Sequence, residues 1–340
     1  MEPLYYVGLD IHKKTIAYCV KQADGTIVDE GTLKAEKEEL IRWCSKLPGP
    51  WHAAMEATLF TGWIYETLEP YAAELQVGNP LMMKAISSAK KKSDRLDART
   101  IADLLRCNLL PRSYMPPAPI RDLRRVLRFR NLMMRQAVRM KNKTSTLLMD
   151  IGMQYNKKKL HGKKYFHELL DSLKAVPQSI RELLEMSRGG YEMFESCQKR
   201  LVRALVEHPE LKTRVEALMS IQGVGEITAL TWALEIGEPH RFRSINKAVS
   251  YCGLCSALDE SAGKSKRCPI SKQRNKHLQT ILIESAKLAP LWNRQLAKVY
   301  DREREHGSNH NQATIAVGRK LVAYLLAVDK SGKAFVMQQA

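Results

Sequence analysis

The amino-acid sequence predicts an α/β domain at the N-terminus, followed by a long helical arm and a mostly helical C-terminal region. Three observations predict this division. Short apolar runs typical of strands alternate with segments of helical spacing only up to about residue 112. Four prolines within residues 111–119 then mark a linker. Beyond the linker, apolar residues recur mainly at the spacing of amphipathic helices.

The chain begins with three predicted strands that are joined by turns. They span residues 4–10, 15–20 and 26–33, and Asp24-Gly25 supplies a turn before the third. Strands joined by such short turns pair antiparallel. The first strand ends in an acid, Asp10.

Helices and strands then alternate. The predicted order is a helix over 36–47, a strand over 51–55, a helix over 61–73, a strand over 75–80 and a helix over 96–110. The strand over 51–55 again leads into an acid, Glu56. Three antiparallel strands followed by this alternation are the element order of an RNase H-like nuclease fold, and open sheets gather functional groups at strand ends.

Two further acids, Asp94 and Asp97, lie three residues apart, so both point to one face of a helix. Their neighbours Lys90–Lys92, Arg95 and Arg99 make a helix laced with salt bridges the alternative to a metal site. Together with Asp10 and Glu56, they favour the metal site. Carboxylate oxygens suit Mg²⁺, and RNase H-like folds hold two such ions against a phosphodiester.

The balance of charge predicts a polyanionic partner. Fifty-five Lys and Arg oppose 36 Asp and Glu, which gives a net charge of +19. Nucleic acid is the commonest partner of such a surface, although a basic protein kept soluble by its charge is the alternative. The predicted long helix over 120–156 has an apolar face and a basic face. Its candidate phosphate contacts are Arg121, Arg124, Arg125, Arg128, Arg135, Arg139, Lys141 and Lys143.

Residues 167–208 continue as helix, with predicted breaks at Pro177 and at Gly189-Gly190, and suit a helical hairpin or coiled-coil arm that could carry oligomerisation. After Pro209, the glycines Gly223 and Gly225 are typical of a helix-hairpin-helix turn that brings backbone amides to a phosphate. A tight turn without a ligand is the alternative.

Residues 259–278 are predicted to form a polar, basic loop. It contains Ser261, Ser265 and Ser271, together with the candidate nucleic-acid contacts Lys264, Lys266, Arg267 and Lys272. A serine needs an activating group to act as a nucleophile, and the loop supplies cations but no evident base. On this chemistry alone Ser261 is a hydrogen-bonding loop serine. Helices over 279–288 and 311–328 follow, and residues 329–340 are predicted to be a loosely held tail.

The location of the protein is predicted from what its sequence lacks. The N-terminus shows no secretory signal, and no apolar run is long enough to span a bilayer, so a cytoplasmic protein without membrane contact is expected. The seven cysteines are then reduced. Cys252, Cys255 and Cys268 lack an obvious fourth zinc ligand apart from His277, so we expect small core residues rather than a zinc site.

The motifs, taken in order, resemble the DEDD-type insertion-sequence transposases of the family numbered one-ten, whose studied members are bridge-RNA-guided recombinases. The resemblance extends from about residue 4 to residue 328. It rests on Asp10, Met55-Glu-Ala-Thr58, Ser93-Asp-Arg-Leu-Asp-Ala98, Ile221-Gln-Gly-Val-Gly225, Tyr251-Cys-Gly-Leu254 and Ile270-Ser-Lys272.

The resemblance implies a RuvC-like catalytic domain over 1–112, a basic coiled-coil arm over 113–208, a transposase domain over 209–330 and a tail over 331–340. It maps the family's acids onto Asp10, Glu56, Asp94 and Asp97, and its nucleophilic serine onto Ser261. Ala262 stands where the family usually has glycine, so Ser265 is the alternative nucleophile.

The activity that the resemblance implies is magnesium-dependent cutting and rejoining of donor and target DNA through a phosphoserine link. A bridge RNA would guide a homo-oligomer, a tetramer or dimer of dimers, in the bacterial cytoplasm at the nucleoid. Each active site would combine acids from one subunit with the serine of another. The alternatives are a RuvC-like Holliday-junction nuclease without serine chemistry and a non-catalytic RNA- or DNA-binding scaffold.

Overall fold

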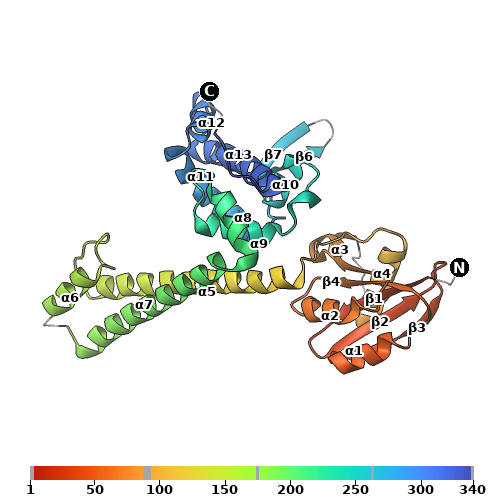
Figure 1. Ribbon diagram of the computed structural model, residues 1–340. Coiled ribbons are helices and arrows are strands. Elements are labelled where there is room, and N and C mark those ends of the chain that lie inside the picture. The colour runs from red at the N-terminus through yellow and green to blue at the C-terminus, as the bar shows by residue number, and fades with distance from the viewer. Residues whose placement is uncertain (1–3, 87–92, 174–175, 262–263, 338–340) are drawn as a thin grey trace. The chain divides into compact units, whose positions relative to one another are not determined.

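The computed structural model describes residues 4–86, 93–173, 176–261 and 264–337, and for residues 257–261 and 264–268 it gives the backbone alone. The chain divides into two units, residues 1–121 and 122–340, which are described separately below. Their elements can be followed in Figure 1. Among the described residues, no helix combines the length and the apolar character that crossing a membrane requires.

A five-stranded sheet in the order β3-β2-β1-β4-β5 forms the centre of the first unit. Its strands are β1 (Tyr5–Ile11), β2 (Thr15–Lys21), β3 (Ile27–Lys34), β4 (Trp51–Glu56) and β5 (Glu74–Gly78). The first three pair antiparallel, whereas β1, β4 and β5 are parallel. The predicted mixed α/β character of this region is confirmed, and the RNase H-like assignment stays a prediction.

The two faces of this sheet are covered by different helices. The helices of the unit are α1 (Lys37–Cys44), α2 (Thr61–Leu68), α3 (Pro80–Ile86) and α4 (Asp94–Arg106). Val7 and Leu9 of β1 belong to the apolar core that α1 and α2 complete. On the opposite face, α4 contributes Ile101 and Leu105 to a cluster with Ala54 of β4. Side chains that alternate along the strands therefore pack against helices on opposite faces of the sheet.

The second unit begins with an antiparallel helical arm, in which α5 and α7 run side by side (Figure 1). The arm consists of α5 (Ala118–Asp150), α6 (Lys163–Ser172) and α7 (Gln178–Val206). Arg130 of α5 donates to the Gln198 side chain of α7 at 2.9 Å, and Lys141 lies 4.4 Å from the centre of the Tyr191 ring. At the far end, α6 closes a small apolar core with Leu148 and Leu184.

The arm differs from the prediction in two places. Helix α5 ends at Asp150 instead of residue 156, because Gly152 turns the chain with a positive φ of 68°. Helix α7 continues through Gly189-Gly190, where a break was expected. A Cβ atom on Gly190 would lie 3.2 Å from Met140 of α5, so this glycine serves close packing between the two helices.

The rest of the second unit is mostly helical, as predicted. It contains α8 (Pro209–Met219), α9 (Glu226–Ile236), η1 (Pro239–Arg241), α10 (Ile245–Tyr251), α11 (Lys276–Leu288), η2 (Ala289–Leu291), α12 (Arg294–Glu305) and α13 (His310–Ser331). The exception is a two-stranded antiparallel sheet, β6 (Ser256–Ser261) and β7 (Lys264–Ile270). The expected loop over 259–278 is therefore wrong for much of its length, because its first part pairs as a β-hairpin.

The end of the chain is held more firmly than predicted. Asp329, where the tail was expected to begin, lies in α13 and accepts two hydrogen bonds from Arg214 and one from Trp232. The backbone N–H of Phe335 donates to the Ser220 hydroxyl at 2.7 Å. These contacts fix the residues that follow α13 against α8.

Candidate functional site

Two of the predicted acids stand at the same edge of the sheet. Asp10 lies near the end of β1 and Glu56 at the end of β4, and these strands are parallel neighbours with Leu9 opposite Met55. Because side chains alternate along a strand, Asp10 and Glu56 belong to the face opposite the buried Leu9 and Met55. That is the face which α4 covers.

Gly8 allows α4 to lie directly on this face. A Cβ atom built on Gly8 would meet the backbone oxygen of Ala98 at 2.1 Å and the nitrogen of Ala102 at 2.4 Å. Any larger residue would therefore force the helix away from β1. The close approach brings the first turn of α4, with Asp94 and Asp97, to the end of β1 where Asp10 lies.

Ion pairs fix α4 along its length. Lys21 of β2, which is almost fully buried, donates to Asp103 at 2.6 Å. Glu30 of β3 pairs with both Arg95 and Arg99, the latter through two bonds of 2.7 Å. The arginines beside the acid pair thus pair with a carboxylate from another element. This arrangement leaves room for a different partner at Asp94 and Asp97.

Among the described residues, one cluster of possible ligand atoms joins Asp10 and Asp94 with His12, which was not among the predicted site residues. The His12 Nε2 atom lies 3.2 Å from Asp10 Oδ2 and 3.3 Å from Asp94 Oδ1. The turn after β1 positions this ring, since the His12 backbone N–H donates to the Thr15 carbonyl at 2.9 Å. The spacing Asp-x-His was visible in the sequence, but nothing there indicated that Asp94 would meet it.

The electrostatics of this cluster are unfavourable for an ionised Asp10. Burial raises the pKa of the Asp10 carboxyl, and the charges of Asp97 and Asp94 raise it further, while the contact with His12 acts in the opposite direction. Asp10 is only 9% exposed, so water screens this repulsion poorly.

These residues fit a divalent cation. One ligand atom from each of Asp10, His12 and Asp94 can lie within 4.8 Å of the other two. A cation there would relieve the repulsion that the three neighbouring acids create. Asp97 is in the same helical turn as Asp94, and Glu56 lies at the adjoining strand end. Arg95 and Arg99 pair with Glu30 rather than with Asp94 or Asp97, and the choice between a metal site and a salt-bridged helix stays a prediction.

Comparison with known proteins identifies the family of the chain. Residues 7–153 match a family model for DEDD-type transposases of the IS110 group, and residues 215–301 match the model described as "Transposase IS116/IS110/IS902 family". Together the two models account for more than half of the chain. The chain belongs to the IS110 transposase family.

Three relatives of this IS110-family chain are described as transposases. A putative transposase, y4qE, of Sinorhizobium fredii is 24% identical over 83% of the chain and 70% of its own length. A probable family 20 transposase of Pseudomonas aeruginosa is 23% identical over 83% of the chain and 82% of its length. The transposase for insertion sequence element IS1111A of Coxiella burnetii is 23% identical over 84% of the chain and 78% of its length.

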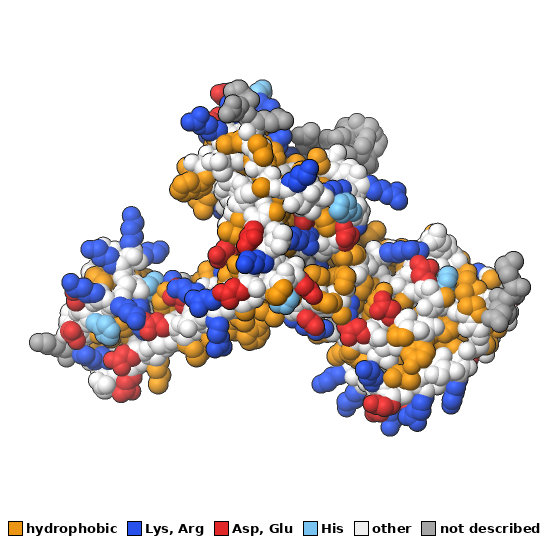
Figure 2. Space-filling view, in the orientation of Figure 1, with side chains coloured by type: hydrophobic (Ala, Val, Ile, Leu, Met, Phe, Trp, Pro, Cys, Tyr) orange, Lys and Arg blue, Asp and Glu red, His pale blue; other side chains and the backbone are white. Residues whose placement is uncertain are grey.

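The basic residues of the arm fall into two groups. Arg121 donates to the Pro116 carbonyl and pairs with Glu66, while Arg124 and Arg128 both pair with Glu235. The packing supports a structural role for these three arginines, and their contact with nucleic acid stays a prediction. The exposed candidates are Arg125, Arg135, Arg139, Lys143 and, despite its ion pair, Arg128, whereas Lys141 is half-buried beside Tyr191. Figure 2 shows further Lys and Arg side chains around α6 at the end of the arm.

The glycines of the α8–α9 turn differ in their surroundings. Gly223 has a φ of +93°, and a Cβ atom there would lie 2.8 Å from Cα of Ala289. Packing against η2 therefore already requires this glycine. Gly225 precedes α9 and has open space at the Cβ position. The predicted phosphate contact of this IS110-family turn stays a prediction.

The candidate serines of this transposase-family chain lie on the β-hairpin. Ser261 ends β6 opposite Lys264, and Ser265 of β7 pairs with Glu260. Residue 262 lies outside the described residues, and the side chains of Lys264, Lys266 and Arg267 are outside the described side chains. Ser271 follows the hairpin, and its backbone N–H donates to the Cys255 carbonyl at 3.0 Å. Lys272 is exposed.

The cysteines of the predicted Cys-x-x-Cys motif differ in burial. Cys252 is fully buried, and burial strongly raises the pKa of its thiol, so it is an inert core residue as predicted. Cys255 is partly exposed, and the side chain of Cys268 is outside the described side chains. His277 donates its backbone N–H to the Asn275 side chain, the N-cap of α11.

Proposed function

We propose that this protein is a DNA transposase that cuts and rejoins donor and target DNA through a phosphoserine intermediate. Support comes from its membership of the IS110 transposase family and from the relatives that are named transposases. The observation that carries the catalytic proposal is the meeting of Asp10, His12 and Asp94 at the end of β1.

The acid cluster would act on the scissile phosphate. Asp10, Glu56, Asp94 and Asp97 would hold magnesium, with His12 beside Asp10 and Asp94. When bound, the metal supplies Lewis-acid stabilisation of charge on the phosphate and on the leaving oxygen. Gly8 would keep α4 close to β1, and Glu30 would hold Arg95 and Arg99, the arginines beside Asp94 and Asp97.

Ser261 would be the nucleophile. Its hydroxyl oxygen would form a bond to phosphorus while the bond from phosphorus to the 3′ oxygen of the DNA breaks. The proton lost by the hydroxyl is balanced by the one that the 3′ oxygen gains. The number of phosphoester bonds is unchanged, so the strand can later be rejoined without a nucleotide cofactor.

Replacing Ser261 with alanine tests the serine chemistry. We expect loss of both strand cutting and the covalent protein–DNA band on a denaturing gel, because the attacking oxygen is gone. Ser271→Ala, just beyond the hairpin, is the matched control and should retain both. A plain RuvC-like nuclease would keep cutting in Ser261→Ala. If Ser261→Ala kept the covalent band and Ser265→Ala lost it, the nucleophile would be Ser265.

Mixing two inactive variants tests whether each active site combines two subunits. If acids and serine come from different subunits of a tetramer or dimer of dimers, Ser261→Ala mixed with Asp10→Asn should recover part of the cutting activity. The two variants kept apart should stay inactive. A mixture that is no more active than its components would contradict the shared site.

An RNA guide is proposed for the choice of DNA sequence, with the exposed cations of the arm holding the RNA backbone. We expect tight binding to an RNA encoded beside the gene, with an affinity that falls steeply as salt rises. Filter binding at several salt concentrations measures this. A scrambled RNA of equal length is the control, and equal affinity for both RNAs would refute the guide.

A further inference from the structure

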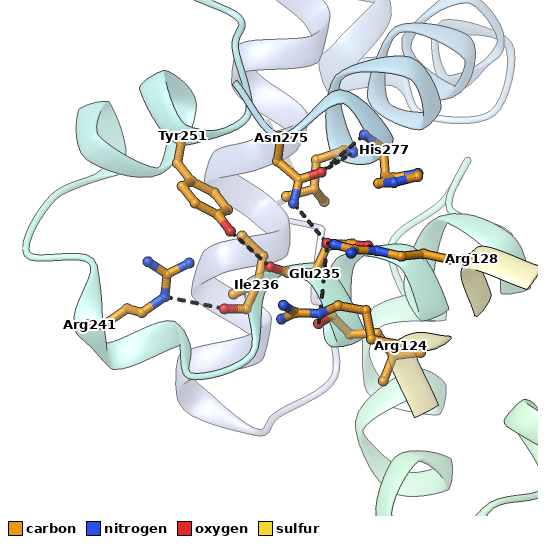
Figure 3. Close-up of polar contacts among 10 residues, drawn as sticks. Arg124, Arg128, Glu235, Ile236, Arg241, Tyr251, Asn275 and His277 are labelled. Carbon is orange, nitrogen blue, oxygen red and sulfur yellow. Dashed lines mark hydrogen bonds and ion pairs between the residues drawn. The ribbon is translucent and has the colours of Figure 1, made fainter. Parts of the chain in front are cut away.

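The second unit contains a fully buried carboxylate, Glu235, in the last turn of α9. Its side chain is 0% exposed. It lies in the apolar run Leu230–Ile236, where an acid is costly unless its charge is compensated. Figure 3 shows the groups that converge on it. Neither the acid cluster nor the proposed serine chemistry uses this residue.

Helix α5 supplies the opposite charge. Arg128 donates two hydrogen bonds to the Glu235 carboxylate, each 2.9 Å long. Arg124 lies 3.8 Å from the same carboxylate and donates to the neighbouring Leu234 carbonyl at 2.9 Å. Burial opposes ionisation of Glu235, but the bonds from Arg128, Asn275 and the charge of Arg124 hold its pKa below the ordinary value. The carboxylate is therefore charged and bound to the arm.

The other contacts of Glu235 lead to the two ends of the β-hairpin. The Asn275 side chain, which follows β7, donates to the carboxylate at 2.8 Å. The hydroxyl of Tyr251, which precedes β6, donates to the Glu235 backbone carbonyl at 3.3 Å. Tyr251 and Asn275 are also joined directly, since the Asn275 N–H donates to the Tyr251 carbonyl at 3.1 Å. One residue of α9 thus holds both stems of the hairpin.

We infer that Glu235 is a positioning residue that ties the hairpin carrying Ser261 to the basic helix α5. The inference rests on the proposed function for its catalytic consequence. An ion pair to a buried carboxylate adds little net stability over an apolar replacement, but it dictates which groups must meet. Here it makes the stems Tyr251 and Asn275 meet the arm at one point. The backbone of the hairpin that carries Ser261 is then held in a fixed relation to the helix proposed to carry the nucleic-acid backbone.

Asn275→Ser is the sharpest test because it separates two roles of one side chain. The Asn275 Oδ1 atom caps α11 by accepting from the N–H groups of His277 and Leu278, while its Nδ2 atom serves Glu235. Serine also caps helices well but is too short to replace the amide donor. Asn309→Ser at the N-cap of α13 makes the same substitution away from Glu235 and is the matched control.

Two measurements on the full chain decide the outcome. Hydrogen exchange should become about tenfold faster at residues 256–270 in Asn275→Ser, as expected for loss of a bond to a charged group, and stay unchanged there in Asn309→Ser. The single-turnover rate of strand cutting should fall by about tenfold, with the affinity for DNA unchanged. A merely structural role would not produce this split between rate and affinity.

Unchanged hairpin exchange in Asn275→Ser, or an equal effect of Asn309→Ser, would overturn the inference. Faster exchange with a normal cutting rate would overturn the positioning role. Hydrogen exchange requires no activity, so it separates this inference from the proposed function. Strand cutting by Ser261→Ala would refute the serine chemistry. Faster hydrogen exchange of the hairpin in Asn275→Ser would still support the link between Glu235 and the hairpin.

Discussion

Replacing Asp10 with asparagine is expected to lower the rate of strand cutting by about 100-fold or more, since several kcal/mol of charge stabilisation would be lost with the metal. The same change should make the metal-free protein more stable. The asparagine side chain would keep the shape of the aspartate but remove a charge that is buried beside Asp94 and Asp97. Thermal unfolding and a cleavage assay measure the two effects.

The sign of the stability effect follows from the raised pKa of Asp10. The folded protein binds the proton of this carboxyl more tightly than the unfolded chain does. The resulting stability is present below the ordinary carboxyl pKa and is lost as the pH rises through the raised folded value. In chelator-containing buffer, the difference in the free energy of unfolding between Asp10→Asn and the wild type should therefore grow as the pH rises from the ordinary carboxyl pKa through the raised folded value. Addition of MgCl₂ should reverse it, because only the wild type gains a bound ion.

Asp301→Asn is the control for the Asp10 experiment, because Asp301 is an exposed acid on α12. It should leave cutting, stability and the response to MgCl₂ unchanged. A normal cutting rate in Asp10→Asn would refute the catalytic proposal. A lower stability of that variant in metal-free buffer would contradict the electrostatic account of the cluster.

The second large effect is expected at Gly8. In Gly8→Ala the added methyl group overlaps with backbone atoms of α4, which cannot move away by a change of rotamer as a side chain can. Overpacking of this kind costs about 1–3 kcal/mol or more, which corresponds to a drop of about 5 °C or more in Tm for the first unit. The shifted helix would also move Asp94 and Asp97 from Asp10, so the response of the Tm to MgCl₂ should shrink.

Gly189→Ala is the matched control for Gly8→Ala. A Cβ atom on Gly189 meets nothing within 4 Å, and the residue lies within α7. Alanine should stabilise this helix by about 0.5–1 kcal/mol. Differential scanning calorimetry compares the two variants. An unchanged Tm and an unchanged response to MgCl₂ in Gly8→Ala would show that α4 does not depend on this contact.

The α/β part of the fold was predictable because its strands are short apolar runs that end in acids, such as Asp10 and Glu56. These signals are local. The hairpin over 256–270 was missed because its residues are polar and basic, without the apolar alternation that marks a half-buried strand. Helix α12 was missed for a similar reason, since charged residues dominate its sequence.

The missed parts of the candidate sites depend on contacts between distant residues. His12 becomes a candidate ligand only because α4 places Asp94 beside it, and this contact joins residues that lie far apart in the sequence. The pairing of Arg128 with Glu235 was not predicted, because the two residues lie 107 positions apart in the chain. One signal was visible in the sequence: Glu235 is an acid within the apolar run of α9, and such an acid requires a buried partner. The sequence indicates that a partner is needed, but it does not identify the residue.

The glycine pair of α7 has a consequence for how the arm opens. Each glycine weakens a helix by about 1 kcal/mol relative to alanine, so the middle of α7 is its least stable part. On one side, Arg130 and Gln198 join the two helices; on the other, Leu148, Leu184 and α6 form a core of their own. We therefore expect the end of the arm to unfold locally more readily than the part of the arm nearer α9.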